Sequence, residues 1–570
     1  MPTTLDDLPV ELLVSILQYL GGRDITRCCS VSRTIQTVVK GSTHFQYFIE
    51  LEAAGMQDVP SNSTDVTTKL SLLRKHQHIM RNQTSPTFKF IEKIVAQYMR
   101  ESWANFDFGG VAYIGQGIFS ELAIGSKNNR WRLLCWQLPR VLLQVPYSHW
   151  TIHFDVPAKA QYAGHTTDIC QGLLFILYGY SNTYNTRSDT FGLAFSLITG
   201  HPHDLASPMS EDIPIFESGP GDMRRTYDST VIGEYVFVIT AKWDDPDDEN
   251  NFHHGPMSGE HFSLVQFNWR TGRRELVATL QLPMDIVEGT TYFHKHRSAA
   301  LLDTSHVAVC STVEENDADI MLVITIIDLE RMRRGLSLRD STLILELPAP
   351  VDSTIIQFSW CNVWHDYLGP EGRWYSCPPG SPLKHPPFEY RNDNAILGFS
   401  WHYTTGPDGP YRGRGEKRTL KWEEWGGYSR IFEGDFEIYR GTNYGSKAII
   451  ASWEDEHDER VVMNSKRWYE FVDFDTTSGG SDKHWQLGNA AEYVTTPTEI
   501  VPIVPMTCGE KLISGSLLPY RRYPLKLSPH PIDVGGQDPP TAATTGCSIL
   551  VEHLQASGWS IYSLDYSADS

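Results

Sequence analysis

The stretch that decides the fold is residues 8–33, which read LPVELLVSILQYLGGRDITRCCSVSR. Pro9 suits the first position of a helix, and Glu11 places a negative charge near the positive end of the helix dipole. Leu12, Ile16 and Leu20 recur every four residues, and Leu13 and Leu17 widen the same apolar stripe. The pattern predicts one amphipathic helix that stops at Gly21-Gly22.

Three more short helices are predicted behind it. Asp24 and Ser32 suit helix N-caps, and a further apolar run starts at Phe45 and ends at Gly55. So small a bundle is marginal alone. The stripe on the first helix holds more apolar residues than two small neighbours cover, and uncovered apolar surface usually marks a protein interface. The alternative is an ordinary helical cap on the main domain.

The same stretch resembles an F-box motif, whose pattern is a Leu-Pro opening, Glu-Leu-Leu, Ile-Leu-x-x-Leu, an Asp-Leu turn and a Val-Cys/Ser-Lys/Arg step. The residues that match are Leu8–Leu13, Ile16–Leu17, Tyr19–Leu20, Asp24–Ile25, Arg27–Cys28 and Val31–Arg33. The chain departs at Ser32, where the family often has Cys, and at Ile35, where it often has Trp. The resemblance covers about residues 5–52, under a tenth of the chain.

The resemblance implies binding to the Skp adaptor of a cullin–RING ubiquitin ligase, and through it to cullin. Carried over position by position, the expected adaptor contacts are Leu8, Pro9, Leu12, Ile16, Leu17 and Leu20. Each of them fits the internal core of the bundle equally well. Leu13 and Val31 are expected in the core. The expected function is a substrate receptor with an unknown protein target, and no substrate-binding residue is assigned.

We expect three domains: an F-box helical domain (1–55), a helical connector (56–105) and a β-rich domain (106–570). In the connector, residues 68–82 are predicted to be helical, followed by a second helix at about 90–99. The order of F-box, short loop, Leu-Leu-Arg-x-His helix and long β region is similar to a large group of fungal F-box proteins.

From about Val111 onward, short alternating runs separated by Gly, Pro, Asn and Asp predict strands. Three units share one order, which is an apolar strand, a polar insert, an alternating strand, a tight turn and a further strand. Their turns lie at Gly200, Gly272 and Gly335, which are 72 and 63 residues apart. This spacing favours an irregular β-propeller of about seven blades. The chain lacks the Gly-His and Trp-Asp signature of WD repeats. Two packed β-sandwiches or an irregular β-helix are the alternatives.

The end of the chain supports the same architecture. Residues 548–552 and 559–564 are predicted to form a final hairpin. Such a hairpin is in a position to close a ring of blades against the N-terminal one. In between, aromatic residues are dense from 360 to 428, as core or as anchors of an interface.

Composition narrows the function further. The chain has 48 Lys+Arg against 69 Asp+Glu, a formal charge of −21, which argues against nucleic acid and anionic membranes as partners. We find no apolar run long enough for a membrane span and no secretory signal. Nine scattered cysteines without a C-x-x-C pair fit a reducing compartment, so we expect a cytoplasmic or nuclear protein.

Catalytic, cofactor and metal motifs are not found. The acidic runs 244–249 and 454–459 read as solvated loops, although they are what would support a carbohydrate-active enzyme. His201/His203 and His294/His296 lack an identifiable third metal ligand, and the basic loop 412–417 reads as an exposed turn. We therefore expect no enzyme activity, no cofactor and no metal. The main alternative to a receptor is a β-propeller interaction scaffold acting outside the ligase.

Overall fold

The computed structural model describes the helical N-terminus almost continuously and the β region mainly through its strands. The described residues are 8–82, 87–95, 112–115, 117–123, 130–140, 144–180, 189–206, 214–216, 223–243, 261–279, 292–315, 319–346, 349–350, 356–364, 380–390, 398–405, 419–420, 443–444, 447–454, 466–473, 492–494, 506–508, 511–512, 520–524, 526–528, 542–544, 548–553 and 558–564.

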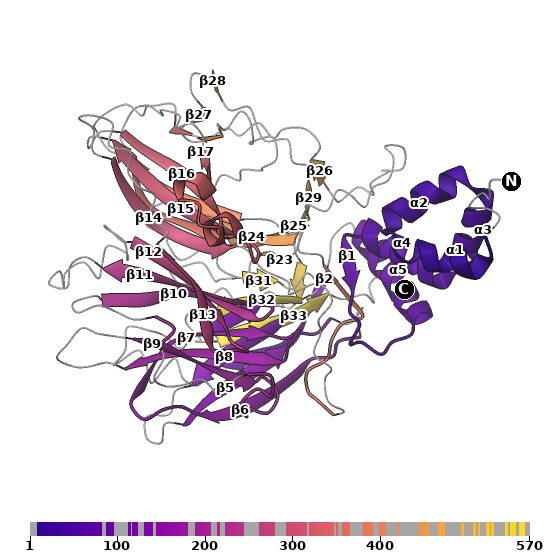
Figure 1. Cartoon of the computed structure of the whole chain (residues 1–570), viewed down its shortest axis with the longest axis horizontal. Helices are drawn as coiled ribbons and strands as arrows, with labels where there is room; N and C mark the ends of the chain where they lie inside the picture. The colour runs from indigo at the N-terminus through magenta and orange to yellow at the C-terminus, as the bar shows by residue number, and fades with distance from the viewer. Residues whose placement is uncertain are drawn as a thin grey trace.

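A helical module opens the chain and stands to one side of the β-rich region (Figure 1). Its elements are α1 (Val10–Leu17), α2 (Gly22–Val31), α3 (Arg33–Gly41), α4 (Thr43–Ala53), β1 (Met56–Asp58) and α5 (Val66–Asn82). α5 packs on α4, where Arg74 and Glu50 form an ion pair of 2.6 Å. The helices predicted within residues 8–55 and at 68–82 are confirmed, but Asp24 is not the N-cap of the second: α2 has Gly21 at its N-cap, and Asp24 lies in its first turn.

The prediction of a second connector helix at about 90–99 is wrong. Residues Thr87–Val95 form strand β2, which pairs antiparallel with β33 (Gly558–Leu564) at the far end of the chain. The apolar residues at 90, 91, 94 and 95 match a helical spacing. The strand forms because a distant partner satisfies its backbone, and Phe90 meets Tyr562 edge-on across the pair.

The rest of the described chain is a large β-rich region of small, mostly antiparallel sheets. In its first part each sheet follows chain order: β3–β6 (Ala112–Gly115, Ile118–Ala123, Arg130–Gln137, Ser148–Asp155), β7–β9 (Ala160–Asp168, Leu173–Tyr180, Thr190–Ser196), β10–β13 (Met223–Ile232, Tyr235–Trp243, His261–Asn268, Arg273–Thr279) and β14–β17 (Tyr292–Leu301, His306–Glu315, Asp319–Asp328, Thr342–Glu346), with the short β22 (Thr419–Leu420) parallel to β17.

The later sheets are less regular. They are β19–β21 (Ile356–Trp364, Gly398–Thr405), β23–β24–β25–β29–β26 (Asn443–Tyr444, Lys447–Glu454, Lys466–Asp473, Tyr520–Pro524, Glu492–Val494), β30–β2–β33–β32–β31 (Lys526–Ser528, β2, β33, Ser548–His553, Ala542–Thr544), β18–β27–β28 (Ala349–Pro350, Met506–Cys508, Lys511–Leu512) and β1–β20 (Met56–Asp58, Phe388–Tyr390).

The three repeated strand units predicted from the sequence are present, and so is the final hairpin, as β32 and β33. All three predicted turn glycines have a left-handed backbone. At Gly200 a Cβ atom would lie 2.4 Å from the backbone oxygen of His153, so only glycine fits there. The turn predicted at residues 331–335 differs, because Leu329–Arg333 form the short helix α7, capped by Asp328.

Neighbouring sheets share their apolar cores. One cluster joins β3–β6 to β7–β9, a second joins β7–β9 to β10–β13, and a third joins β10–β13 to β14–β17. The first strands of consecutive sheets also contact one another, in the order β3, β7, β10, β14, β19. At the other end of the chain, β31 contacts β24 and β23. The yellow C-terminal strands lie beside the indigo N-terminal strand β2 (Figure 1).

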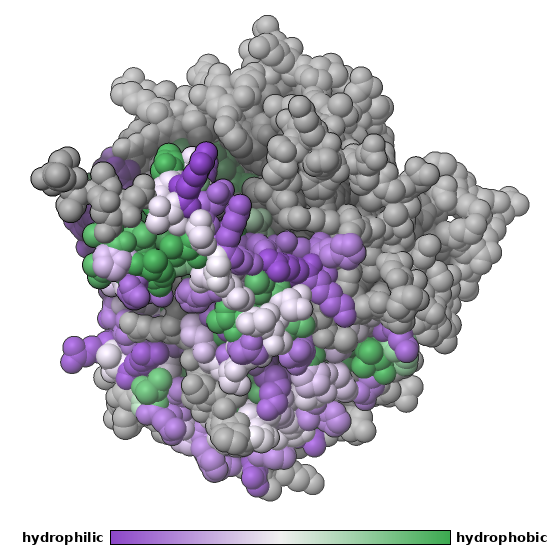
Figure 2. All heavy atoms as spheres, turned by 90° about the vertical axis from the view of Figure 1, so that its right-hand side faces the viewer, coloured by the Kyte–Doolittle hydropathy of each residue, from purple (hydrophilic) through white to green (hydrophobic). Residues whose placement is uncertain are grey.

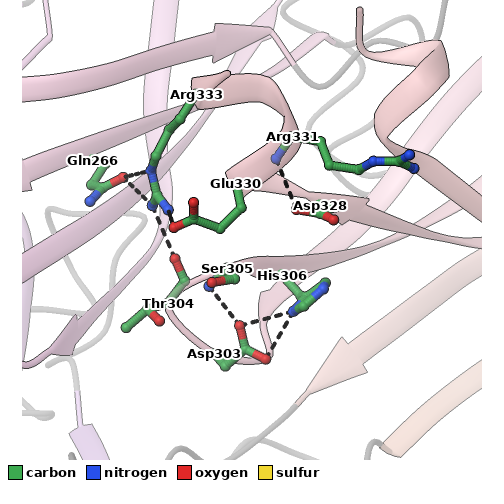
Figure 3. Close-up of polar contacts among 9 residues, drawn as sticks. All are labelled: Gln266, Asp303, Thr304, Ser305, His306, Asp328, Glu330, Arg331 and Arg333. Atoms are coloured by element: carbon green, nitrogen blue, oxygen red, sulfur yellow. Dashed lines mark hydrogen bonds and ion pairs between the residues drawn. The ribbon is translucent and has the colours of Figure 1, made fainter. Parts of the chain in front are cut away.

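Polar contacts connect the short turns at one end of the sheets. Gln171, after β7, donates to the Gly233 carbonyl after β10 and accepts from Arg270 after β12. Farther along, Arg333 of α7 reaches Gln266 and the carbonyl oxygen of Thr304, at 3.1 and 3.0 Å (Figure 3). We call this end of the sheets the turn end.

Candidate functional site

The first helix of the module begins where the sequence predicts. Pro9 occupies the N-cap position of α1 with φ of −52°, and Glu11 lies in the first turn. The helix is short, and Gln18 is its C-cap residue. Because an isolated helix of this length is marginal in water, α1 depends on packing against the rest of the module.

That packing is supplied by a small apolar core. Leu17 of α1 packs with Ile25 of α2, Ile35 and Val39 of α3, and Phe45 of α4. Two serines set the starts of the later helices: the Ser32 hydroxyl accepts from the Ile35 amide at 3.1 Å, and Ser42 caps α4 in the same way. Caps of this kind stabilise a helix by about 1 kcal/mol each.

The apolar stripe of α1 divides into two. Leu13 and Leu17 point inward, while Leu12, Ile16 and Tyr19 remain 51%, 43% and 91% exposed. Pro9 and Val10 are exposed at the start of the helix. We call the exposed set, Pro9, Val10, Leu12, Ile16 and Tyr19, the α1 ridge. Figure 2 views the molecule from the side of the helical module, and hydrophobic residues, in green, gather in a patch on this face.

The residues predicted to contact an adaptor differ in their solvent exposure. Pro9, Leu12 and Ile16 are exposed, and Leu8 and Leu20 are half-buried. Leu17 is 2% exposed and lies in the module core, which is the alternative that the sequence left open for each of these residues. It follows Leu13 by four residues, so the two side chains lie on the same face of α1, one turn apart, and both point into the core.

Val31 is a correction to the sequence analysis. It was expected in the core, but it is 84% exposed at the end of α2. The buried side of α2 is made by Ile25, with Cys28 and Cys29 packed against the core. Val31, two residues beyond Cys29, projects from the last turn toward solvent. Leu13, the other residue expected in the core, is 1% exposed.

Tyr19 and Val10 were missed as candidate contacts. Tyr19 follows Ile16 by three residues and Leu12 by seven, which is the spacing of one helical face. That signal was present in the sequence. None of the ridge residues is charged, so this surface is suited to binding a partner through apolar contact.

The other candidate sites give no competing centre among the described residues. His203 is buried, with its Nε2 3.1 Å from the Gln171 carbonyl oxygen and its ring edge-on to Trp269. Burial lowers the pKa of His203, so the neutral ring is favoured in this packing. No group of three His, Cys, Asp or Glu in the described part of the chain is placed to hold a metal ion.

Several predicted features lie outside the described residues. They are the acidic run 244–249, residues 455–459 of the second run and the basic loop 412–417. Of the aromatics between 360 and 428, Trp360 and Trp364 are in β19 and Phe399, Trp401 and Tyr403 in β21, where the backbone pairing is described. His294 and His296 belong to β14, likewise through their backbone. Of the described helices, none has the length and apolar character needed to cross a membrane.

The comparisons with known proteins agree with the helical module. The F-box-like family matches residues 5–48, which span α1 to α4 up to Phe48. No curated protein matches the chain. Among solved structures, the WD40 domain of SCAP from fission yeast aligns over 80% of this chain and 91% of that chain, with 6% identity and a TM-score of 0.18. So low a score carries no argument about the β region. The chain therefore has an F-box-like domain at its N-terminal end, followed by a large β-rich region.

Proposed function

We propose that this protein is a non-catalytic substrate receptor of a Skp–cullin–F-box ubiquitin ligase. It would bind the Skp adaptor through the F-box-like domain and a target protein through the β region. The observation that carries the proposal is the α1 ridge, an apolar surface that the described chain leaves uncovered within a matched F-box-like domain. Apolar side chains gathered on one helix face favour a protein partner.

The shape of the ridge fits a helical partner surface. Leu12 and Ile16 lie one turn apart on one face of α1, and the exposed Tyr19 follows in the turn after the helix, so a groove between helices would cover them together. Leu8 and Leu20 flank this face and are half-buried, which leaves part of each available to a partner. We therefore keep Leu8, Pro9, Leu12, Ile16 and Leu20 as proposed adaptor contacts and add Val10 and Tyr19.

For the β region we propose an irregular propeller. Two observations support it: the consecutive contacts of β3, β7, β10, β14 and β19, and the sheet in which N-terminal β2 pairs with C-terminal β33. First strands that meet in chain order are typical of blades around an axis, and a shared first and last blade closes such a ring. Rigid strands with variable connections suit a target-binding platform.

In the sheets β7–β9 and β10–β13, the lengths of the connections favour one end of this platform for the target. At the turn end, β10 and β11 are joined by residues 233–234 and β12 and β13 by residues 269–272. At the opposite end, residues 181–189 join β8 to β9, and residues 244–260 join β11 to β12. Longer connections offer more sequence for recognition. We propose that the target docks at the opposite end, and we name no contact residues.

We also propose a cytoplasmic or nuclear location. Its support is that Cys28, Cys29 and Cys135, three of the cysteines among the described residues, are free thiols. Burial raises the pKa of Cys135 and Cys170, so both stay as inert thiols in the core. A reducing compartment preserves this state.

The test uses the full chain and purified Skp adaptor. The wild-type chain is expected to capture the adaptor in a pull-down, and a Leu8→Ala/Pro9→Ala variant is expected to lose it while its thermal unfolding stays cooperative. Leu205→Ala is the control, because Leu205 is an exposed apolar residue of the β region. A folded wild-type chain that fails to capture the adaptor defeats the proposal.

Adding cullin to this experiment distinguishes a ligase receptor from an interaction scaffold that works outside the ligase. A complex of chain, adaptor and cullin supports the ligase receptor. A stable complex with the adaptor that excludes cullin supports the alternative, an interaction scaffold that works outside the ligase.

A further inference from the structure

We propose that residues 380–390, here called the bridging segment, lock the F-box-like domain to the β region at one angle. The segment would thereby set the position of a bound target relative to the ligase. The inference rests on the proposed function. It concerns residues more than 230 positions away from most of the groups that they contact.

The bridging segment binds the helical module through its second half. Residues Phe388–Tyr390 form β20, which pairs antiparallel with β1. Phe388 is fully buried in a cluster with Tyr47 and Leu51 of α4 and Leu70 and Leu73 of α5. Two further contacts extend the joint: the Val59 amide donates to Pro387, and the Asn62 side chain donates to the His385 carbonyl at 2.8 Å.

Its first half binds the β region. Leu383 is fully buried in the core cluster shared by β3–β6 and β7–β9. The Lys384 amide donates to Gln137 Oε1 at 2.8 Å, and the Gln137 side-chain amide donates back to the Lys384 carbonyl. Ser148 Oγ donates to the Pro382 carbonyl at 2.8 Å. One short segment thus has one apolar anchor in each of two separate cores.

A buried ion pair sets the position of the segment between these anchors. Arg140, in the connection between β5 and β6, pairs with Glu389, and both side chains are 3% exposed. Gly117 leaves the space that Arg140 fills, since a Cβ atom there would lie 2.1 Å from Arg140 Nη2. Buried pairs add little net stability over apolar packing, but a mispaired charge is costly, so they favour one arrangement over others.

The module side of the joint is itself braced. Lys69 of α5 is buried, and its Nζ lies 2.8 Å from Asp58 Oδ1 of β1, which also accepts from the Tyr47 hydroxyl at 2.7 Å. Val145, beside Arg140, packs directly into the same cluster as Phe388. α4, α5, β1 and the bridging segment therefore form one packed unit with the first sheet.

Without this packed unit, the position of the helical module relative to the β region would be set by a chain connection alone. The α1 ridge and the β region are then related by this packing and not only by the chain connection from α5 to β2. An adaptor on the ridge and a target on the β region would be held at a constant separation. Only target lysines within a limited zone would meet the charged ubiquitin carrier.

The test measures this geometry in the full chain. Spin labels are introduced as non-natural amino acids at Gln36 of α3 and Val277 of β13, both exposed, because the chain has nine cysteines. Pulsed electron–electron double resonance then reports the distribution of distances between the two labels, with and without Skp adaptor. One narrow distribution is expected for the wild-type labels, and the same distribution for Phe388→Leu, which keeps an apolar anchor.

Phe388→Ala and Glu389→Ala are expected to broaden the distribution while adaptor affinity stays unchanged. Leu301→Ala is the matched control: it removes a buried leucine from the core between β10–β13 and β14–β17, so it lowers stability without touching the joint. Its distribution should stay narrow. A broad wild-type distribution overturns the inference, even if the alanine variants fail to fold. The inference is also overturned if the alanine variants fold and their distance distributions stay narrow. Loss of adaptor binding by the wild-type chain with a narrow distribution defeats the proposed function instead.

Discussion

Replacing Leu12 and Ile16 together by alanine tests the α1 ridge directly. Both side chains project from α1 outside the module core, with 51% and 43% of their surface exposed. Those two fractions together amount to about one fully exposed side chain. Covering one such side chain with a partner contributes roughly 1.5–3 kcal/mol.

The expected loss of adaptor affinity follows from that figure. Each 1.4 kcal/mol corresponds to about a tenfold change in Kd, so the double variant should bind the Skp adaptor about 10–100-fold more weakly. The fold should tolerate the change, because alanine is a good helix former and the core residues stay in place. Leu17→Ala should do the opposite and cost about 2–5 kcal/mol of folding stability, since Leu17 is buried.

Isothermal titration calorimetry of the full chain with purified adaptor gives the Kd, and thermal unfolding followed by circular dichroism gives the stability. Leu205→Ala, 53% exposed on the β region, is the control for loss of surface apolar area. The reasoning is refuted if the double variant folds normally and its Kd rises by less than about twofold. In that case the ridge does not contact the adaptor.

Three more predictions concern the fold. Ser32→Ala removes the hydroxyl that accepts from the Ile35 amide, so the unfolding free energy of the helical module should fall by about 1 kcal/mol; an unchanged denaturant midpoint would speak against the cap. Burial raises the pKa of Glu121, whose Oε1 has no hydrogen-bond partner among the described residues. The raised pKa favours the protonated, folded state at low pH, and this contribution is lost as the pH rises through that pKa. Glu121→Gln should therefore raise the melting temperature at pH 7 and gain less as the pH falls toward 4.5; a gain that grows in acid contradicts the argument. Truncation after Asp538 removes β31–β33 and leaves β2 without its antiparallel partner, so the melting temperature should drop, and an unchanged value would rule out closure by the final hairpin.

Local patterns predicted much of the structure. The helix starts at Pro9 and Ser32, the helix at 68–82 and the repeated strand units depend on neighbours within a few residues, and these predictions are confirmed. Turn glycines such as Gly200 belong here too, because a left-handed backbone is a local requirement. The same local reasoning placed an apolar stripe on the first helix.

Which side of that stripe is covered was decided by tertiary packing. Periodicity gave Leu12 and Leu17 equal standing as contacts, but the positions of α2, α3 and α4 bury Leu17 and leave Leu12 exposed. Val31 was misplaced for the same reason. A stripe identifies an apolar face, and only the neighbouring helices fix where the core ends.

By itself, the sequence determined the F-box-like helices and the strand-rich character of the remainder, because both are encoded in the spacing of nearby side chains. The tertiary structure alone decided that residues 87–95 pair with the last strand and that Glu389 meets Arg140 across 249 positions. Contacts at such separations leave no periodic signal. They form because two distant segments each leave apolar surface, backbone groups or charges unsatisfied that the other can satisfy.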